Sequence, residues 1–261
     1  MSGQNAGIHP AAFVDPKARI GAGVSIGPGA IVGPDVTIGD GTRIEGHAVV
    51  LGWTTIGREC RLHHGAVVGS PPQDLKYSGE PSYLEIGDRT VLREYMTANL
   101  ATEPGFTTRI GSDCLLMAYS HVAHNCQIGN RVVVANAVQM AGYVIVDDWA
   151  IVGGGTVVHQ FTRIGRHSMI GGGSRIPQDI APFVKAAGSP PRNAGINAIG
   201  LERRGIPRET REALDRAYRV FFRGGLTAVR AIEEIRTQLP GIPEVEHFAR
   251  FCETSVRGIS R

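Results

Sequence analysis

Aromatic residues, cysteines and long apolar runs are all scarce in this sequence of 261 residues. Aromatics make up 6% of it, and its four cysteines, Cys60, Cys114, Cys126 and Cys252, form no C-x-x-C pair. This excludes a disulfide framework and a zinc ribbon and predicts reduced thiols in the core. No apolar run approaches the ~20 residues that a membrane helix needs. Because no basic stretch is followed by an apolar block near Met1, we expect a cytoplasmic protein without stable membrane insertion.

Net charge is also small. The formal charge is +3, and no basic stripe is interleaved with aromatic residues, so the composition argues against a nucleic-acid partner. Residues 202–261 hold 12 Lys/Arg against 9 Asp/Glu. A modestly cationic C-terminal end of this kind can attract an acidic partner or can simply be solvated.

Glycine, in contrast, is abundant, with 35 residues, and it accompanies a repeat of six. Steps of six from Ile8 to Ile176 meet an aliphatic residue at 25 of 29 positions. Glycine often follows that residue directly, and the position four residues after it is mostly small. The exceptions, Asp74, Glu80, Ala98 and Pro104, lie in two stretches, about 70–84 and 98–109, that we interpret as extruded loops.

A period of six fits neither a helix nor an alternating strand, but it fits a short strand followed by a corner. Three such units make a coil of 18 residues, and stacked coils about 4.8 Å apart pair each strand with those above and below it. The fold class is therefore mainly β: a parallel β-helix over residues 1–190. Residues 191–261 are expected to form a helical domain, with helices from Pro207 to a break at Gly224-Gly225, over 226–238 and over 243–254.

The chemistry is expected where polar residues align between coils. Steps of 18 place His124 beneath Gly142 and then Gln160, and Asn125 beneath Tyr143. An imidazole can accept a proton from an attacking hydroxyl near neutral pH, and a backbone N–H can hold an oxyanion. The column therefore indicates acyl transfer.

Several motifs together closely resemble the UDP-N-acetylglucosamine O-acyltransferase family, which carries out the first step of lipid A synthesis. The likeness covers essentially the whole chain. It is carried by Ser120-His121-Val122-Ala123-His124-Asn125-Cys126, Gln73-Asp74-Leu75-Lys76-Tyr77, Gly79-Glu80-Pro81, Val158-His159-Gln160-Phe161, Gly195-Ile196-Asn197 and Gly200-Leu201-Glu202-Arg203-Arg204-Gly205.

This resemblance implies a left-handed β-helix and a homotrimer with active sites between neighbouring subunits. The implied reaction moves an (R)-3-hydroxyacyl chain from the phosphopantetheine of acyl carrier protein to the 3-hydroxyl of the UDP-sugar, with no metal and no other cofactor. His124 would be the general base, Gly142 the oxyanion donor, and Gly172 the position that sets acyl length, its missing side chain favouring longer chains. The implied substrate-binding residues are Asp74, Lys76, His121, Tyr143, His159, Gln160, Asn197, Arg203 and Arg204. Arginines 203, 204, 208, 211, 216, 219 and 223 are candidates for contact with the carrier protein.

Some positions depart from the family pattern. Asn125 occupies the position where an aspartate is common. It is counted with His124 and Gly142 as a catalytic residue, because it can still accept a hydrogen bond and orient the imidazole, but it carries no charge. Tyr143 replaces a histidine, Ile199 a glutamate, and Ala98-Asn99-Leu100-Ala101-Thr102 the usual I-H-R-G-T run. One interpretation is a changed acceptor, such as a UDP-sugar with an amine at C3; neutral drift within an O-acyltransferase is the other.

Three further classes are disfavoured by particular residues. Glycine clusters such as Gly153-Gly154-Gly155 fall on the repeat and are predicted turns rather than phosphate loops. A zinc carbonic anhydrase on this scaffold needs two histidines five residues apart. The residues five positions after His121 and His124 are Cys126 and Gly129, so the required pair is missing. A non-enzymatic solenoid would show a regular threonine ladder on a flat face, and this sequence has none. Another nucleotide-sugar acyltransferase of the hexapeptide-repeat superfamily remains open.

Overall fold

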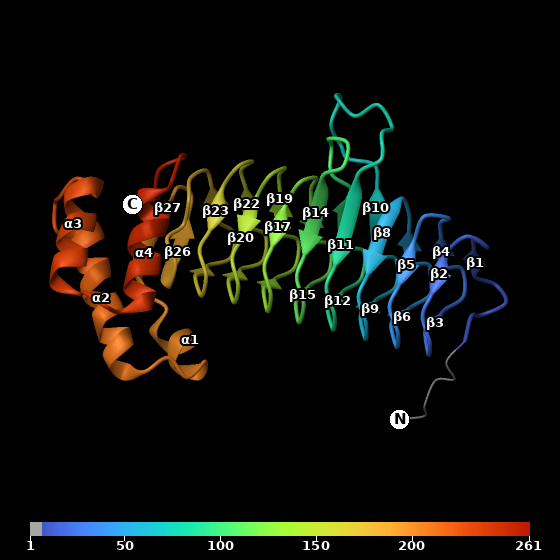
Figure 1. Ribbon diagram of the computed structural model, residues 1–261, viewed down its shortest axis with the longest axis horizontal. Helices are drawn as coiled ribbons and strands as arrows, with labels where there is room; N and C mark the ends of the chain where they lie inside the picture. Colours follow the sequence, from blue (N-terminus) through green and yellow to red (C-terminus); the bar gives the residue numbers. More distant parts are fainter. Residues whose placement is uncertain (1–6) are drawn as a thin grey trace.

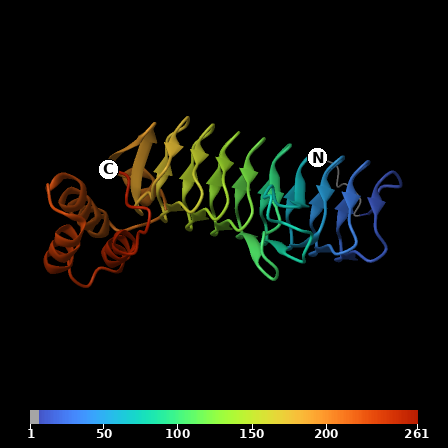
Figure 2. The same ribbon diagram turned by 90° about the horizontal axis from the view of Figure 1, so that it is seen from above.

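Short parallel strands stack into three sheets that form the sides of a long triangular coil, and a group of helices follows at its C-terminal end (Figure 1). The structure is a computed structural model and describes residues 7–261. The part of the predicted β-helix over residues 1–6 lies outside the described residues. Figure 2 shows the same coil from above, with one coil following the next along its axis.

Successive strands of the coil fall on three sheets in turn, and an antiparallel pair of strands ends the third sheet. The sheets are numbered in the order in which the chain meets them. Sheet 1 contains β1 (Phe13–Val14), β4 (Ile31–Val32), β7 (Val49–Val50), β10 (Val67–Ser70), β13 (Thr97–Asn99), β16 (His121–Val122), β19 (Gln139–Met140), β22 (Val157–Val158) and β25 (Arg175–Ile176). Sheet 2 contains β2 (Arg19–Ile20), β5 (Thr37–Ile38), β8 (Trp53–Ile56), β11 (Tyr83–Ile86), β14 (Thr107–Ile110), β17 (Gln127–Ile128), β20 (Ile145–Val146) and β23 (Arg163–Ile164). Sheet 3 contains β3 (Ser25–Ile26), β6 (Arg43–Ile44), β9 (Arg61–Leu62), β12 (Val91–Leu92), β15 (Leu115–Leu116), β18 (Val133–Val134), β21 (Ile151–Val152), β24 (Met169–Ile170), β26 (Val184–Gly188) and β27 (Pro191–Ile196).

The chain turns three corners in each coil. Corner 1 joins sheet 1 to sheet 2, corner 2 joins sheet 2 to sheet 3, and corner 3 joins sheet 3 to sheet 1. Strand pairing confirms the predicted step of 18, as in His121 beside Gln139 and Gln139 beside Val157. From Ile26 onward the aliphatic residues of the repeat point inward and form the core, as Val122 and Ile170 do, whereas Ile8 in the first coil is half exposed.

Most corners of the coil turn without a glycine in the left-handed backbone conformation. The left-handed backbone conformation falls three residues after the inward aliphatic residue and is adopted mostly by other residues, including Asn125 and Tyr143. The glycine that often follows the aliphatic residue is needed for another reason, which is the close approach of the backbone of the neighbouring coil. At Gly39 an added Cβ would lie 2.6 Å from the backbone carbon of Gly57 in the next coil. The next coil therefore leaves no room for a side chain there.

Both predicted loops leave corner 1, but each is shorter than expected. The first covers residues 71–82, between β10 and β11, and the second covers residues 100–106, between β13 and β14. The prediction that Ala98 lies in a loop is wrong: it is buried in β13 and pairs with Val68 and Val122. Alanine is small but still inward-facing, so the aliphatic rule missed it.

Two contacts hold the loops against each other. The side chain of Asn99 donates from Nδ2 to the carbonyl of Pro71 at 3.1 Å, and the Leu100 N–H donates to the carbonyl of Ser70 at 3.0 Å. The two insertions therefore form one projection above corner 1 (Figure 1).

The C-terminal region contains α1 (Ala198–Arg203), α2 (Arg208–Arg223), α3 (Ala228–Gln238) and α4 (Pro243–Glu253). The three predicted helices are confirmed, and α1 was not predicted because its six residues show little periodicity. Among residues 7–261 no helix is long and apolar enough to cross a membrane. The β26–β27 hairpin spans residue 190, so the proposed division at that point falls within a continuous sheet.

The predicted core thiols are confirmed. Cys60, Cys114, Cys126 and Cys252 are free and buried. Burial raises the pKa of each of these thiols, to about 12 for Cys126. They are therefore protonated and unreactive at neutral pH.

Candidate active site

His124 and Gly142 lie directly above one another at corner 1, as the step of 18 predicts. His124 follows β16, and Gly142 follows β19. An ideal Cβ built on Gly142 would stand 2.4 Å from Cε1 and 2.6 Å from Nε2 of His124. The imidazole therefore rests on the backbone of the next coil, and only glycine allows this.

Hydrogen bonding determines which ring nitrogen of His124 carries the proton. Nδ1 lies 3.0 Å from Oδ1 of Asn125, and the same oxygen accepts the Thr102 N–H at 3.0 Å. Because that oxygen is an acceptor, Nδ1 is the donor in the neutral ring. Nε2 is then left with a free lone pair, and it faces Oδ2 of Asp74 at 4.0 Å.

The backbone N–H of Gly142, next to the His124 ring, is a hydrogen-bond donor without a partner in residues 7–261. In contrast, the N–H groups on either side of it bond to the carbonyls of Val158 and His124. A base and a free N–H thus stand together at one corner, which is the arrangement that acyl transfer requires.

The predicted neighbours Asn125 and Tyr143 belong to a network that the sequence did not reveal. Glu103, on the second loop, accepts from Nδ2 of Asn125 at 2.7 Å and from the hydroxyl of Tyr143. The Tyr143 hydrogen bond lowers the pKa of Glu103, and Asn125 adds to the effect. Burial raises the pKa of Tyr143 to about 12, with Glu103 acting in the same direction. At neutral pH Glu103 is therefore a carboxylate and Tyr143 a phenol.

Aromatic rings close one side of this corner. The ring of Tyr143 meets His124 edge-on with 5.4 Å between centroids, and it stacks on Phe161 at 4.7 Å. Phe161 is half exposed and was not singled out from the sequence. Its place in the column could have been read from the step of 18 after Tyr143.

Asp74 and Lys76 behave differently on the first loop. Asp74 is held by its own turn, with Oδ1 accepting the Lys76 N–H at 3.0 Å, and its other carboxylate oxygen faces His124. The Lys76 side chain is exposed. Asp74 therefore lies beside His124, whereas the Lys76 side chain extends into solvent.

The other residues predicted to bind the sugar, His121, His159 and Gln160, lie in two different coils of the β-helix. His121 points outward from sheet 1, and its Nδ1 bonds to the hydroxyl of Thr97 at 2.7 Å. Burial lowers the pKa of His121, and nearby His124 adds to the effect, so the ring is neutral at pH 7. His159 and Gln160 are exposed in the coil beyond Gly142.

Asn197, Arg203 and Arg204 lie at corner 2 rather than beside His124. The amide of Asn197 is buried and caps α1: its oxygen accepts from the Gly200 N–H at 3.3 Å, and its nitrogen donates to the carbonyl of His167 at 3.0 Å. Arg204 bonds to Nδ1 of His167 at 3.1 Å. Arg203 is exposed.

Gly172 lies at the third corner. It follows β24, is exposed, and its missing Cβ would stand 3.1 Å from the carbonyl oxygen of Gly154. The residues predicted for base, nucleotide and acyl chain are thus divided among corners 1, 2 and 3 of one chain.

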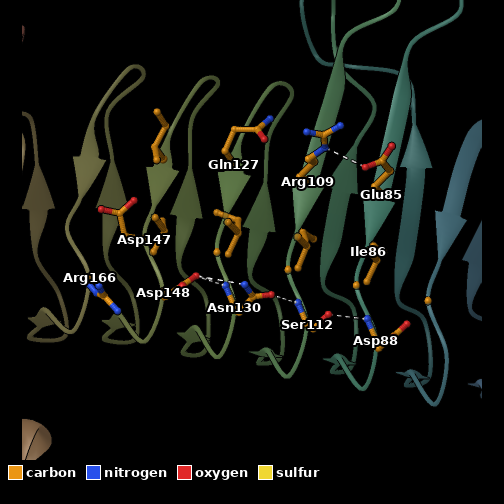
Figure 3. A pocket seen from close by; sticks show the side chains of 18 of the residues that line it. Glu85, Ile86, Asp88, Arg109, Ser112, Gln127, Asn130, Asp147, Asp148 and Arg166 are labelled. Atoms are coloured by element: carbon orange, nitrogen blue, oxygen red, sulfur yellow. Dashed lines mark hydrogen bonds and ion pairs between the residues drawn. The ribbon is translucent and has the colours of Figure 1, made fainter. Parts of the chain in front are cut away.

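A groove of about 710 Å³ lies elsewhere, along the outer face of sheet 2 (Figure 3). Several of its polar side chains satisfy the backbone of corner 2: the N–H of Asn130 bonds to Asp148 at 2.7 Å, and that of Ser112 to Asn130 at 2.9 Å. Glu85 and Arg109 pair with each other above them. The groove contains none of the predicted site residues, so corner 1 remains the candidate active site.

Among residues 7–261 no group of three His, Cys, Asp or Glu side chains is placed to hold an ion.

Comparison with known proteins gives consistent matches over nearly the whole chain. A family model described as UDP N-acetylglucosamine O-acyltransferase, domain 2, matches residues 179–260, and a bacterial transferase hexapeptide model matches residues 5–40, 35–70 and 107–142. The acyl-(acyl-carrier-protein)–UDP-N-acetylglucosamine O-acyltransferases of Herminiimonas arsenicoxydans and Alkalilimnicola ehrlichii are 46% and 51% identical, each covering 97% of this chain and 99% of the relative. The crystal structure of LpxA from Acinetobacter baumannii is similar with a TM-score of 0.94 and 43% identity, over 97% of this chain and 99% of that one.

Proposed function

The chain belongs to the acyl-(acyl-carrier-protein)–UDP-N-acetylglucosamine O-acyltransferase family, and we propose that it transfers an (R)-3-hydroxyacyl chain from acyl carrier protein to the 3-hydroxyl of UDP-N-acetylglucosamine at corner 1. This is the first step of lipid A biosynthesis, and we predict that it takes place in the cytoplasm. One observation carries the location of the site: the imidazole of His124 rests on Gly142 beside an N–H that has no acceptor within residues 7–261.

The proposed chemistry begins with Nε2 of His124. It accepts the proton of the sugar hydroxyl while the hydroxyl oxygen attacks the thioester carbonyl. The Gly142 N–H donates to the oxyanion that forms on the carbonyl oxygen. When the tetrahedral intermediate collapses, the carbon–sulfur bond breaks and the imidazolium returns its proton to the leaving thiolate. Ester and free carrier thiol are the products.

Asp74, His121, Tyr143 and Gln160 are proposed to surround the sugar, with His159 and Lys76 at the edge of the cleft. The placement of two of these residues supports this: Asp74 lies 4.0 Å from the base, and Tyr143 meets the His124 ring edge-on. A carboxylate there can accept from a sugar hydroxyl and so orient it toward Nε2.

Nucleotide binding by Asn197, Arg203 and Arg204 and control of acyl length by Gly172 require more than one chain. These residues lie at corners 2 and 3, and the packed core of the coil separates them from His124. Only neighbouring copies can bring three corners of a prism together, so we propose a homotrimer with the active sites between subunits. Outward apolar side chains on two sheets, Val157 and Met169, are more than a third exposed and suit such contacts.

An arginine opposite a pyrophosphate is physically apt, because a guanidinium binds phosphate oxygens through paired hydrogen bonds. Arg203 is exposed and free to move in this way. Asn197 differs, because both ends of its amide already have partners in the chain. Its contribution to nucleotide binding is therefore to hold the N-terminus of α1.

Acyl carrier protein is the proposed partner of the arginine-rich α2. Three of the arginines named for this contact are partly neutralised, since Arg208 pairs with Glu212, Arg211 with Glu202, and Arg219 with Asp215. Of the remaining candidates, Arg204 is already bonded to His167, so Arg203, Arg216 and Arg223 would carry more of the attraction to an acidic protein.

Because Asn125 carries no charge, a second acyl acceptor, a UDP-sugar with an amine at C3, is also considered. An amine at C3 of the sugar is a better nucleophile than a hydroxyl and demands less of the base, so an N-acyltransferase reaction is the alternative.

A transfer assay tests both reactions. The purified enzyme is incubated with (R)-3-hydroxyacyl carrier proteins of several chain lengths and with either UDP-N-acetylglucosamine or its 3-amino analogue, and products are measured by mass spectrometry. Ester formation with the natural sugar supports the proposal, and exclusive amide formation supports the alternative. Absence of transfer to both acceptors from every donor would overturn the assignment.

A further inference from the structure

A carboxylate stands behind the proposed base, although the residue beside the base is neutral. The chain of hydrogen bonds runs from Nδ1 of His124 to Oδ1 of Asn125 at 3.0 Å, and from Nδ2 of Asn125 to Oε2 of Glu103 at 2.7 Å. We propose that Glu103 is a positioning residue of the proposed acyltransferase, which supplies the negative charge behind His124 through the Asn125 amide. This inference rests on the proposed function.

Glu103 determines the orientation of the Asn125 amide. A carboxylate only accepts hydrogen bonds, so the amide nitrogen must face Glu103, and the amide oxygen must face His124 and the Thr102 N–H. Thr102 and Glu103 are neighbours on the second loop. The loop thus holds the amide from both ends and keeps the proton of His124 on Nδ1, which leaves Nε2 free to act as base.

The Asn125 amide also transmits the electrostatic effect of the Glu103 carboxylate to His124. A carboxylate bonded to the N–H side of an amide polarises it, and the oxygen on the other side becomes a stronger acceptor. When His124 takes the proton from the substrate it becomes a cation, and a strongly polarised acceptor at Nδ1–H stabilises that cation. Tyr143 holds the second oxygen of Glu103 and keeps the carboxylate in place.

Other titratable groups face His124 and must be counted in any pH profile. Asp74 approaches Nε2 from the first loop at 4.0 Å, and His121 lies near enough in β16 to feel the charge of His124. Tyr143 comes from the next coil and is a neutral phenol near pH 7. Asp74 therefore places negative charge on the substrate side of the ring, and Glu103 places it behind the ring.

The first test is Glu103→Gln, which keeps the size of the side chain and removes its charge. We expect kcat to fall roughly 10- to 100-fold with little change in KM for the sugar, and the acid limb of the kcat/KM profile to move to lower pH by about half a unit to one unit. Glu85→Gln is the matched control, since Glu85 is a half-exposed carboxylate paired with Arg109 on sheet 2. An unchanged kcat and an unmoved acid limb in Glu103→Gln would overturn the proposal.

The second test restores a carboxylate beside the ring. In the Glu103→Gln background, Asn125→Asp should recover at least ~10-fold of the lost kcat, because the new carboxylate would bond to His124 directly and could accept from the new amide at position 103. In the wild-type background the same change places two carboxylates at hydrogen-bond distance and should lower kcat. If Asn125→Asp restores no kcat in the Glu103→Gln background, the charge behind His124 is not what Glu103 supplies, and that outcome would refute our assignment.

A third measurement needs no substrate. Nitrogen-15 NMR of labelled histidine reports which ring nitrogen carries the proton, and the His124 signal is identified by its loss in a His124 variant. The Nδ1–H form should dominate in the wild-type protein, and Glu103→Leu should give a mixture. If the wild-type enzyme transfers no acyl chain, the proposed function fails while this readout still decides the role of Glu103. A wild-type ring protonated on Nε2 would contradict the network itself.

Discussion

The His124 ring occupies the space that a side chain at Gly142 would need. An ideal Cβ at residue 142 would lie 2.4 Å from the ring carbon Cε1, well inside contact distance. The ring is only 14% exposed and is enclosed by Tyr143 and the first loop, so it cannot simply swing away. Residue 142 and the base are therefore locked together by packing as well as by their proposed chemistry.

Gly142→Ala is expected to displace the base. Misplacement of a catalytic group by about 1 Å can cost ~100-fold in rate, and we expect a loss of that order in kcat. Gly33→Ala is a suitable control, because its Cβ would meet its nearest neighbour at an ordinary 3.6 Å. Steady-state kinetics of both variants check the prediction, and equal activity of Gly142→Ala and wild type would show that His124 does not need this place.

His124→Ala should reduce acyl transfer by roughly 100-fold or more if the imidazole is the general base. His64→Ala is the matched control, since His64 is a largely exposed histidine at corner 3. Both variants are compared at saturating substrate. An unimpaired His124→Ala enzyme would remove this residue from the mechanism.

Much of this site could be foreseen because the repeat is a geometric rule. Equal steps of 18 place Gly142 next to His124 from the sequence alone, and the inward aliphatic positions predict the core in the same way. The rule stops where the chain leaves the coil. Glu103 lies in the second loop, where no period relates it to Asn125 or Tyr143.

Some residues predicted to bind a ligand are already hydrogen-bonded within the folded chain. Asn197 is predicted as a ligand for the nucleotide, but its amide is occupied by Gly200 and His167. Sequence patterns do not show whether a polar group is already paired. Similarly, the period does not identify the short helix α1, which depends on this cap.

Gly172→Met should shift donor preference toward shorter acyl chains. Residue 172 is exposed at corner 3, so a long side chain there would project into the space beside the coil. Competition between carrier proteins with different chain lengths measures the shift. An unchanged length profile would count against this glycine as the end of the acyl groove.

Asn197→Ala should destabilise the protein by about 1–2 kcal/mol, because it removes an N-cap. It also leaves the buried carbonyl of His167 without the amide nitrogen. Asn197→Ser retains a capping oxygen and should recover part of the loss. Denaturant unfolding compares the three proteins. If Asn197→Ala raises KM for the UDP-sugar without any change in unfolding, the residue acts as a direct ligand instead of a cap.

The phenol of Tyr143 should make the protein sensitive to alkali. Its pKa is raised to about 12 in the folded chain by burial and by Glu103, against about 10 in an unfolded one. The folded state therefore holds this proton more tightly. The stability linked to the proton is fully present below pH 10 and is lost as the pH rises toward 12. Tyr143→Phe removes the group, so the difference in unfolding free energy between wild type and variant should be constant below pH 10 and change between pH 10 and 12, with wild type losing more. The other tyrosines and the lysines titrate in both proteins and cancel in that difference. A pH-independent difference across this range would mean that the Tyr143–Glu103 hydrogen bond does not hold the phenol proton in solution.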